Sequence, residues 1–491
     1  MQKITAVRRL VDIIHRLHDG LIGLDETKRR AYETFQSVEI VLNEIAFDLA
    51  FSVLIEYFFN PTKKARTILQ RKKISKDELL AGHRFIRKSK LVKMMFLSNY
   101  FPRSLLIRSA ANLLNFMQQS PQYLPKILRG KLVGPMMLEI HPTNAMCIYR
   151  CQMCIWCGGQ EQMIPIDDFY RTEHLLTTNE WYNLLEEVRD LGTRQIIFSG
   201  GGETLLSPAK VKPVLDRANL IGLETMIYTN GRTLHDADLA LLDFILNSTW
   251  LRISLHAATP KIYSRLINRP LEANDLGFVL DGIRKVVSLK EQRGRKLKVG
   301  IGVVLQELNY AEVANIAKLC SDLEIDFLDV RVDCIGVTKK LSKRQYEQML
   351  ESLRELRFNV ENGQFGFSVS FADDLLMAMD QWKGMEMTQP KRCLIPAVRP
   401  AVDPFGIVGA CDSIGEPYTR SKSPREYVLG QISDDCTFVD VMRSAAGKKL
   451  GVHCNFCMPG QMSLNALLEK LIDDFRIGIT PDNQPFYFAT D

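Results

Sequence analysis

Cys147-Ile148-Tyr149-Arg150-Cys151-Gln152-Met153-Cys154 is the stretch around which the rest of the chain is arranged. It places three cysteines at spacings of three and two residues, directly after the apolar run 136–140, which is typical of a β-strand. Three thiolates on one short loop can bind three corners of an iron–sulfur cube and leave the fourth iron without a protein ligand. An iron with an open position can bind and react with a substrate, so the stretch predicts a reactive cluster.

From residue 135 onwards the sequence alternates between strand and helix patterns. The expected strands are 136–140, 195–199, 224–229, 250–255, 298–305 and 327–332. The expected helices are 180–191, 208–220, 236–246, 275–290, 310–323 and 342–358. Strands separated by helices of this length require parallel pairing and right-handed crossovers, which predicts an α/β fold. Functional groups of such a sheet gather where the carboxyl ends of its strands meet, here called the mouth, and the cysteine loop is expected there.

Other polar residues follow the strands at the same expected mouth. The second strand ends in a glycine run and a carboxylate, Gly200-Gly201-Gly202-Glu203, which lets a ligand approach the backbone closely and suits an ammonium group. Later strand ends carry Asn230, Ser254, His256, Arg331, Asp333 and Cys334. We expect these side chains to face one cavity.

The combination resembles the radical S-adenosylmethionine (radical SAM) superfamily over about 136–332. The resemblance implies a partial (β/α)6 barrel in which Cys147, Cys151 and Cys154 hold a 4Fe-4S cluster whose open iron chelates S-adenosylmethionine (SAM). It also implies which residues bind the cofactor. Gly201, Gly202 and Glu203 match the segment that receives the SAM amino group, Ser254 matches the ribose contact, and we assign Asn230 to the same cofactor site.

The implied chemistry is electron transfer into SAM and release of a 5′-deoxyadenosyl radical that takes a hydrogen atom from the substrate. The electron would come from a flavodoxin- or ferredoxin-type donor. Two residues depart from the family pattern: Met153 stands where an aromatic residue is frequent, and Cys157 adds a fourth cysteine. Cys157 is interpreted as a bystander thiol, with a fourth cluster ligand or a zinc tetrathiolate as alternatives.

A second set of cysteines follows residue 360. Cys393 and Cys411 flank a probable hairpin containing Gly406, and Cys454 and Cys457 form a CxxC turn. The arrangement is similar to the SPASM and twitch extensions of radical SAM enzymes, which implies a second, auxiliary 4Fe-4S cluster near the barrel mouth. Structural zinc is the alternative on ligand types alone. Cys436 is a possible alternate ligand, and Cys320, within an apolar helix pattern, is interpreted as a buried thiol.

The sequence divides into a helical N-terminal domain at 1–132, the barrel at 133–360 and an auxiliary-cluster domain at 361–491. The chain has 491 residues, 46% apolar and 24% charged, as in a globular protein with a large core. No signal peptide or membrane span is expected, and the protein is placed in the cytoplasm. Residues 63–93 carry twelve Lys and Arg against two acidic residues, which indicates a solvated helix face or an anion contact. No nucleic-acid module is recognised.

Three classes of function remain. In the first, the substrate is a small amino sugar, aminocyclitol or nucleotide-linked precursor, and the front of the chain loosely resembles the radical SAM deaminase of aminodeoxysugar biosynthesis; Arg331, Asp333 and His256 would contact substrate or transfer protons. In the second, the enzyme modifies a ribosomally made peptide by thioether formation, crosslinking or epimerisation, and Cys334 would return a hydrogen atom. In the third, the protein is a non-catalytic iron–sulfur or zinc protein.

Overall fold

The structure is a computed structural model, and it describes most of the chain from residue 131 to residue 475. The described residues are 112–113, 116, 120, 123–128, 131–142, 147–154, 175–200, 202–333, 340–379, 393–412, 427–445 and 459–475. The expected N-terminal helical domain therefore lies almost wholly outside them. Chain contacts form two units: residues 134–383 with 392–459 and 486–491, and residues 1–133 with 384–391 and 460–485. The three-part division stays a prediction. Two helices, α8 (Tyr123–Leu128) and most of α20 (Pro459–Phe475), belong to the second unit.

One sheet of ten strands forms the centre of the larger unit, in the order β10-β9-β8-β1-β2-β3-β4-β5-β6-β7. Its strands are β1 (Met137–Ile140), β2 (Gln195–Phe198), β3 (Glu224–Thr229), β4 (Trp250–Ser254), β5 (Lys298–Leu305), β6 (Phe327–Val332), β7 (Ser368–Phe371), β8 (Ala401–Val402), β9 (Ile407–Gly409) and β10 (Val428–Gln431). All pairings from β8 through β1 to β7 are parallel, and β9 and β10 are antiparallel. Among the described strands no pairing joins β7 to β10, so they form an open barrel.

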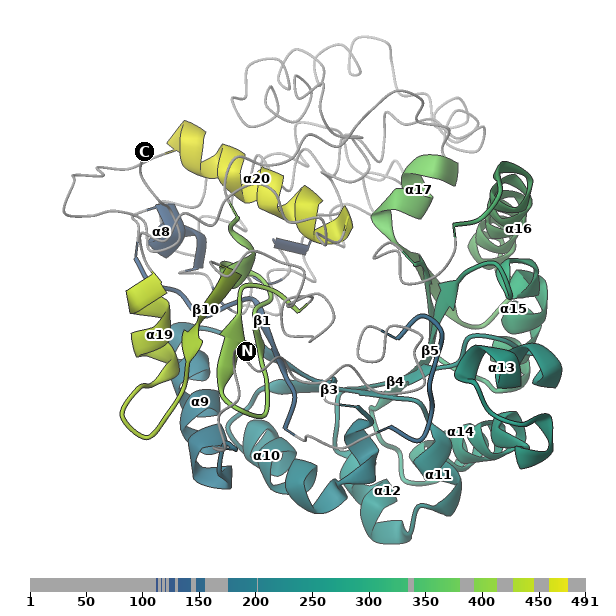
Figure 1. The fold of residues 1–491 in the computed structure, drawn as a ribbon, viewed down its shortest axis with the longest axis horizontal. Coiled ribbons are helices and arrows are strands. Elements are labelled where there is room, and N and C mark those ends of the chain that lie inside the picture. The colour runs from purple at the N-terminus through teal and green to yellow at the C-terminus, as the bar shows by residue number, and fades with distance from the viewer. Residues whose placement is uncertain are drawn as a thin grey trace, which may run out of the picture. The chain divides into compact units, whose positions relative to one another are not determined.

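Helices follow the parallel strands β1 to β7 and the antiparallel strand β10, and most of them lie on the outer face of the curved sheet (Figure 1). They are α9 (Thr178–Leu191), α10 (Pro208–Leu220), α11 (Arg232–Asp236), α12 (Leu239–Leu246), α13 (Pro260–Ile267), α14 (Asp275–Gln292), α15 (Val313–Asp322), α16 (Lys343–Glu361), α17 (Asp373–Met379) and α19 (Phe438–Ala445). Local sequence explains their starts. Thr177 and Glu180 make a reciprocal capping box at α9, as Ser342 and Gln345 do at α16.

The expected α/β fold and open barrel are confirmed, and all six expected strands exist within one residue of their expected ends. The structure adds β7, a short strand with two serines at the edge of the sheet, whose polarity hid it from the hydrophobic pattern. The expected helix 236–246 begins later, as α12, because Asp238 caps it with a bond from the Leu241 amide, and a separate short helix, α11, precedes it.

Small residues on β5 make room for large side chains inside the barrel. A Cβ on Gly300 would lie 2.4 Å from the Phe327 ring, and one on Gly302 would lie 2.3 Å from the Arg252 guanidinium. That guanidinium lies 4.8 Å from the centre of the Tyr228 ring and forms a 3.1 Å ion pair with Asp329. The barrel interior next to Gly300 and Gly302 is therefore filled by side chains that pair with one another.

The hairpin β8–β9 extends the sheet past β1. Ala401 lies beside Glu139, and Gly406 makes the turn with a φ of 81°. The Asp412 amide then bonds to the Arg399 carbonyl, so the chain returns beside the start of β1. No described helix is long and apolar enough to cross a membrane.

Candidate functional site

The cysteine loop is attached to the end of α13. The amides of Arg150 and Gln152 donate to the carbonyls of Ile267 and Leu266, each at 3.0 Å. The Arg150 guanidinium also donates to carbonyls of its own loop, at Cys147 and Tyr149. These bonds use the last carbonyls of a helix, which have no partner inside the helix. They hold the loop beyond the carboxyl end of β1, as the sequence predicted.

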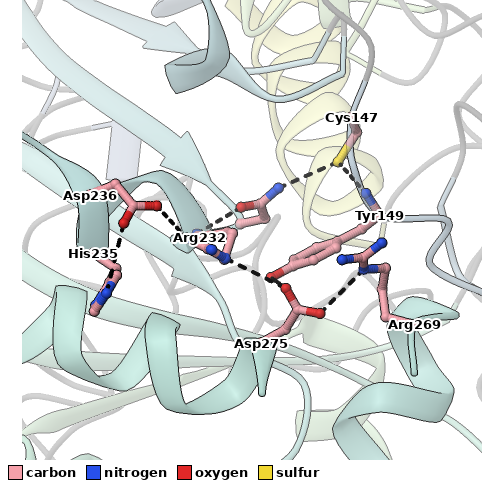
Figure 2. Close-up of polar contacts among 8 residues, drawn as sticks. Cys147, Tyr149, Arg232, His235, Asp236, Arg269 and Asp275 are labelled. Atoms are coloured by element: carbon pink, nitrogen blue, oxygen red, sulfur yellow. Dashed lines mark hydrogen bonds and ion pairs between the residues drawn. The ribbon is translucent and has the colours of Figure 1, made fainter. Parts of the chain in front are cut away.

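Tyr149 anchors the same loop from its buried side. Its hydroxyl donates to Asp275 Oδ1 at 3.2 Å, and Arg269 Nε donates to the other oxygen at 3.3 Å. Arg232 Nε lies 3.6 Å from Asp275 Oδ1, which completes a cluster of one carboxylate, two guanidinium groups and a phenol (Figure 2). Asp275 is the first residue of α14 and only 5% exposed. This cluster joins the cysteine loop to α11 and α14.

The three predicted cluster ligands, Cys147, Cys151 and Cys154, form no disulfide and have intermediate exposure. Burial raises the pKa of the Cys147 thiol, with the nearby Glu203 carboxylate as a smaller contribution in the same direction. Burial also raises the pKa of Tyr263, and Cys151 and Cys147 add to this shift, so both thiols lie near that ring. Metal binding would deprotonate such thiols.

Asn230 connects the cysteine loop to the end of β3. Its Nδ2 donates to Cys147 Sγ at 3.4 Å, and its Oδ1 accepts from the Arg232 amide at 2.9 Å. The sequence assigned Asn230 to the cofactor, and the structure places its side chain on a predicted cluster ligand. The Tyr149 amide also donates to Cys147 Sγ, at 3.4 Å.

Glu203 is the carboxylate that the sequence singled out, and it is 3% exposed. Its Oε1 accepts from the Leu205 amide and the Thr229 hydroxyl, and its Oε2 accepts from the Asn230 amide at 2.6 Å. Burial raises the pKa of Glu203 and these neutral donors oppose the shift. A carboxylate has about four acceptor positions. One position on Oε2 therefore remains for a cationic group such as an ammonium.

These residues fit the cofactors that the sequence implies. A cube takes one thiolate on each of three irons, so its ligands need not converge on one ion. Within the described ranges, no three His, Cys, Asp or Glu side chains surround a single metal position. The donor set of Cys147, Cys151 and Cys154 beside the buried Glu203 carboxylate suits a cluster next to a ligand with a positive charge.

The other predicted site residues that the structure describes lie on or directly after β2, β4 and β6. Ser254 ends β4, on the same face of the strand as Arg252, and Arg331 lies on the inward face of β6 near Arg252. Asp333 follows β6, where its amide bonds to the Leu305 carbonyl at 3.3 Å. His256 is buried, and its Nδ1 accepts from the Val304 amide at 3.1 Å. Gly202 has a φ of 103°. Gly201, Cys334, Cys454, Cys457 and Cys157 lie outside the described residues.

The two described auxiliary cysteines flank the β8–β9 hairpin, which confirms that hairpin. Because β8 is parallel to β1 and β9 runs back, Cys411 lies beside the start of β1, whereas Cys147 follows its end. Cys411 therefore lies toward the end of the sheet opposite the mouth, and the position of the auxiliary cluster stays a prediction because Cys454 and Cys457 lie outside the described residues. Cys436 closes a small bridge with Ser433, and Cys320 is buried in α15, as expected.

Sequence reasoning missed the anchors of the site. Tyr149 lies inside the quoted stretch, but its partner Asp275 is 126 residues away and has no motif around it. Glu139 and His141 at the end of β1 were also missed. Glu139 is buried and binds Arg399, and His141 lies against Gly200, where a Cβ would lie 2.3 Å from His141 Nε2. A charged residue in the middle of an apolar strand was the available signal for Glu139.

Comparison with known proteins finds a family match in the central part of the chain. Residues 144–320 match the radical SAM superfamily. Among solved structures, SuiB from Streptococcus suis bound to S-adenosylmethionine is 15% identical, with a TM-score of 0.42 over 75% of this chain and 76% of its own. Native anSMEcpe with bound AdoMet is 15% identical, with a TM-score of 0.45 over 67% of this chain and 88% of its own. Native anSMEcpe with bound AdoMet and Kp18Cys peptide is 14% identical, with a TM-score of 0.44 over 70% and 98%.

Proposed function

Because this chain carries a radical SAM domain over residues 144–320, we propose that it is an enzyme that abstracts a hydrogen atom from a natural-product precursor. A 4Fe-4S cluster and SAM are the cofactors of such a domain, and when bound they supply a 5′-deoxyadenosyl radical by reductive cleavage of SAM. The observation that carries the proposal is the meeting of Cys147, Asn230 and Glu203 at the carboxyl ends of β1, β2 and β3.

The chain's own residues bind and orient in this proposal. Cys147, Cys151 and Cys154 would hold the cluster, and the loop is fixed by Tyr149 and by the end of α13. Glu203 would accept from the SAM amino group, and Ser254 would contact the ribose. A flavodoxin- or ferredoxin-type protein would supply the electron. Cys393, Cys411, Cys454 and Cys457 would hold the auxiliary cluster, for which zinc is the competing occupant.

The charges inside the barrel support a small polar substrate, such as an amino sugar, an aminocyclitol or a nucleotide-linked sugar. Arg252, Asp329 and Arg331 share the inward faces of β4 and β6. Their hydrogen-bonding groups suit hydroxyl, amino or phosphate groups better than an apolar ligand. The proposed substrate contacts are Arg331 on β6 and Asp333, which directly follows β6.

The test begins with anaerobic iron and sulfide analysis of reconstituted wild type and of a C147A/C151A/C154A variant. We expect about eight irons in wild type, about four in the variant, and deoxyadenosine from SAM only with wild type. About four irons with zinc present would make the C-terminal site structural. Deoxyadenosine release by the triple variant would refute the proposal.

The substrate class is tested by deuterium transfer. Deuterated aminocyclitols, nucleotide-linked sugars and short peptides would each be incubated with the reconstituted enzyme, SAM and reductant. Deuterium in deoxyadenosine from a sugar or cyclitol alone would support the proposed class. Transfer from peptides alone would replace it with peptide maturation.

A further inference from the structure

The amide of Asn230 has a fixed orientation. Its Oδ1 accepts from the Arg232 amide at 2.9 Å, which leaves the Nδ2 group as the part of the side chain that faces Cys147 Sγ at 3.4 Å. Reversing the amide would break the first bond and place an oxygen against the sulfur. The turn is therefore built to present a donor to this thiol.

The turn that carries Asn230 is itself held on both sides. Before it, the Thr229 hydroxyl accepts from the Gly231 amide at 3.0 Å, and the Asn230 amide donates to Glu203. After it, the Arg232 guanidinium lies 4.2 Å from the centre of the Phe278 ring and bonds to Asp236 at 2.7 Å. A donor held by this many contacts loses little freedom when it bonds to sulfur.

A donor at this position has an electrostatic consequence. A cluster that accepts an electron gains negative charge, and part of that charge resides on its cysteine sulfurs. Hydrogen bonds to the sulfurs stabilise the reduced state more than the oxidised state and so raise the reduction potential. Cys147 receives two such donors within the described residues, the Tyr149 amide and Asn230 Nδ2, and only the second comes from a side chain that mutation can change.

We propose that Asn230 is a positioning residue that raises the reduction potential of the cluster bound by Cys147, Cys151 and Cys154 through its bond to the Cys147 sulfur. The inference rests on the proposed function, because it requires a cluster at these cysteines. It assigns Asn230 to the cluster in place of SAM. Loss of the donor makes the cluster harder to reduce.

Two substitutions distinguish the loss of the Nδ2 donor to sulfur from the loss of the bond to the Arg232 amide that supports the turn. N230S keeps a hydroxyl that can accept from the Arg232 amide but cannot reach the sulfur, and N230A removes both groups. Asn247, at the exposed end of α12, provides the matched control N247S. Reconstituted proteins would be titrated with a redox mediator series, following by electron paramagnetic resonance the reduced cluster whose signal changes when SAM is added.

At a fixed solution potential, we expect the ratio of reduced to oxidised cluster to fall about threefold to tenfold in both N230S and N230A, where tenfold is about 59 mV for one electron. N247S should match wild type, and iron content should be the same in all four proteins. A wild-type potential in N230S with a shift only in N230A would overturn the inference, because the turn and not the donor would then matter.

Unchanged potentials in both variants with full iron content would also overturn it. So would iron loss in both variants, since Asn230 would then be needed to assemble the cluster and not to set its potential. Failure of the proposed function looks different: wild type itself would show no reduced cluster that responds to SAM.

Discussion

His256 shows how burial decides what a titratable side chain can do. It follows β4, is 8% exposed, and accepts from the Val304 amide at 3.1 Å, while Asn309 Nδ2 donates to its carbonyl at 2.6 Å. Burial lowers the pKa of His256 to about 4, with a smaller contribution from the nearby Arg252 charge. An imidazole that stays neutral and accepts a backbone bond connects β4 to β5, and this favours a structural role over proton transfer.

The first prediction concerns the pH dependence of stability. In the unfolded chain His256 takes a proton near pH 6.5, but in the folded chain only near pH 4, so its contribution is complete above 6.5 and is lost as the pH falls. Between pH 7 and pH 4 this loss is about 3 kcal/mol. H256N keeps an acceptor for Val304 without titrating, and urea unfolding should show a loss smaller by about that amount. Equal losses in H256N and wild type would contradict this.

At the residue scale, the sequence predicted what could be read from types and spacing. Cys147 and Glu203 were singled out as candidate site residues because each follows a recognisable strand. The contact of Asn230 with Cys147 could not be predicted, because the direction of its amide depends on the Arg232 amide and hence on a turn with φ of 79° at Gly231. The residue type determines which groups can form a hydrogen bond, and the turn conformation determines where those groups point.

At the element scale, the cysteine loop depends on helices that no sequence motif predicts. Helix α13 has eight residues, too few for a clear hydrophobic period, and yet its last carbonyls hold the loop. Asp275 at the start of α14 bonds to Tyr149 and Arg269 and lies near Arg232. The alternation of long elements predicted the sheet, and the short elements that position the site came only with the structure.

D275N tests this support. The neutral amide would leave Arg269 and Arg232 without their shared carboxylate and weaken the bond that holds Tyr149, so the loop should open more often. We expect a chelator to remove iron from reconstituted D275N several-fold faster than from wild type. D281N removes a carboxylate from an exposed pair with Arg284 on the same helix and should leave this rate unchanged. Equal rates for D275N and wild type would show that the loop does not depend on this cluster.

The packing of β5 gives a second prediction at this scale. A methyl group at residue 300 would meet the Phe327 ring at 2.4 Å, so G300A should lower the free energy of unfolding by about 1–3 kcal/mol. At Gly366 a Cβ would meet nothing within 4 Å, and G366A should differ from wild type by about 0.5 kcal/mol or less. Denaturant unfolding measures both, and the prediction fails if the two variants are alike.

At the scale of the whole molecule, a buried group of charges joins the C-terminal hairpin to the first strand of the barrel. Arg399 Nε donates to Glu139 Oε2 at 3.1 Å, across 260 residues of sequence, and Arg399 lies 3.3 Å from Asp412. Although burial opposes it, Arg399 holds the pKa of Glu139 well below its usual range, with His141 and Ser199 adding to the effect. No spacing rule connects residues this far apart, so the sequence predicted the hairpin but not its attachment.

R399M should therefore destabilise the protein at neutral pH by about 3–5 kcal/mol, because it removes the guanidinium that the buried Glu139 and Asp412 carboxylates share. The deficit should shrink as the pH falls towards 5, since Glu139 without Arg399 can take a proton at higher pH and become neutral. Urea unfolding at pH 7 and pH 5 measures both effects. R189M, which removes an exposed pair with Asp190, serves as the control with an expected change of about 1 kcal/mol or less.

The hairpin has a further consequence for self-association. A strand with one unpaired side offers its free amides and carbonyls to any other chain, and β1, with the apolar sequence Met-Leu-Glu-Ile, would offer them if β8 were absent. A chain shortened to end before residue 392 would thus leave one edge of β1 unpaired. We expect such a chain to precipitate even with its cysteine loop intact. The C-terminal hairpin, in this sense, covers the edge of β1 that would otherwise pair with a neighbouring molecule.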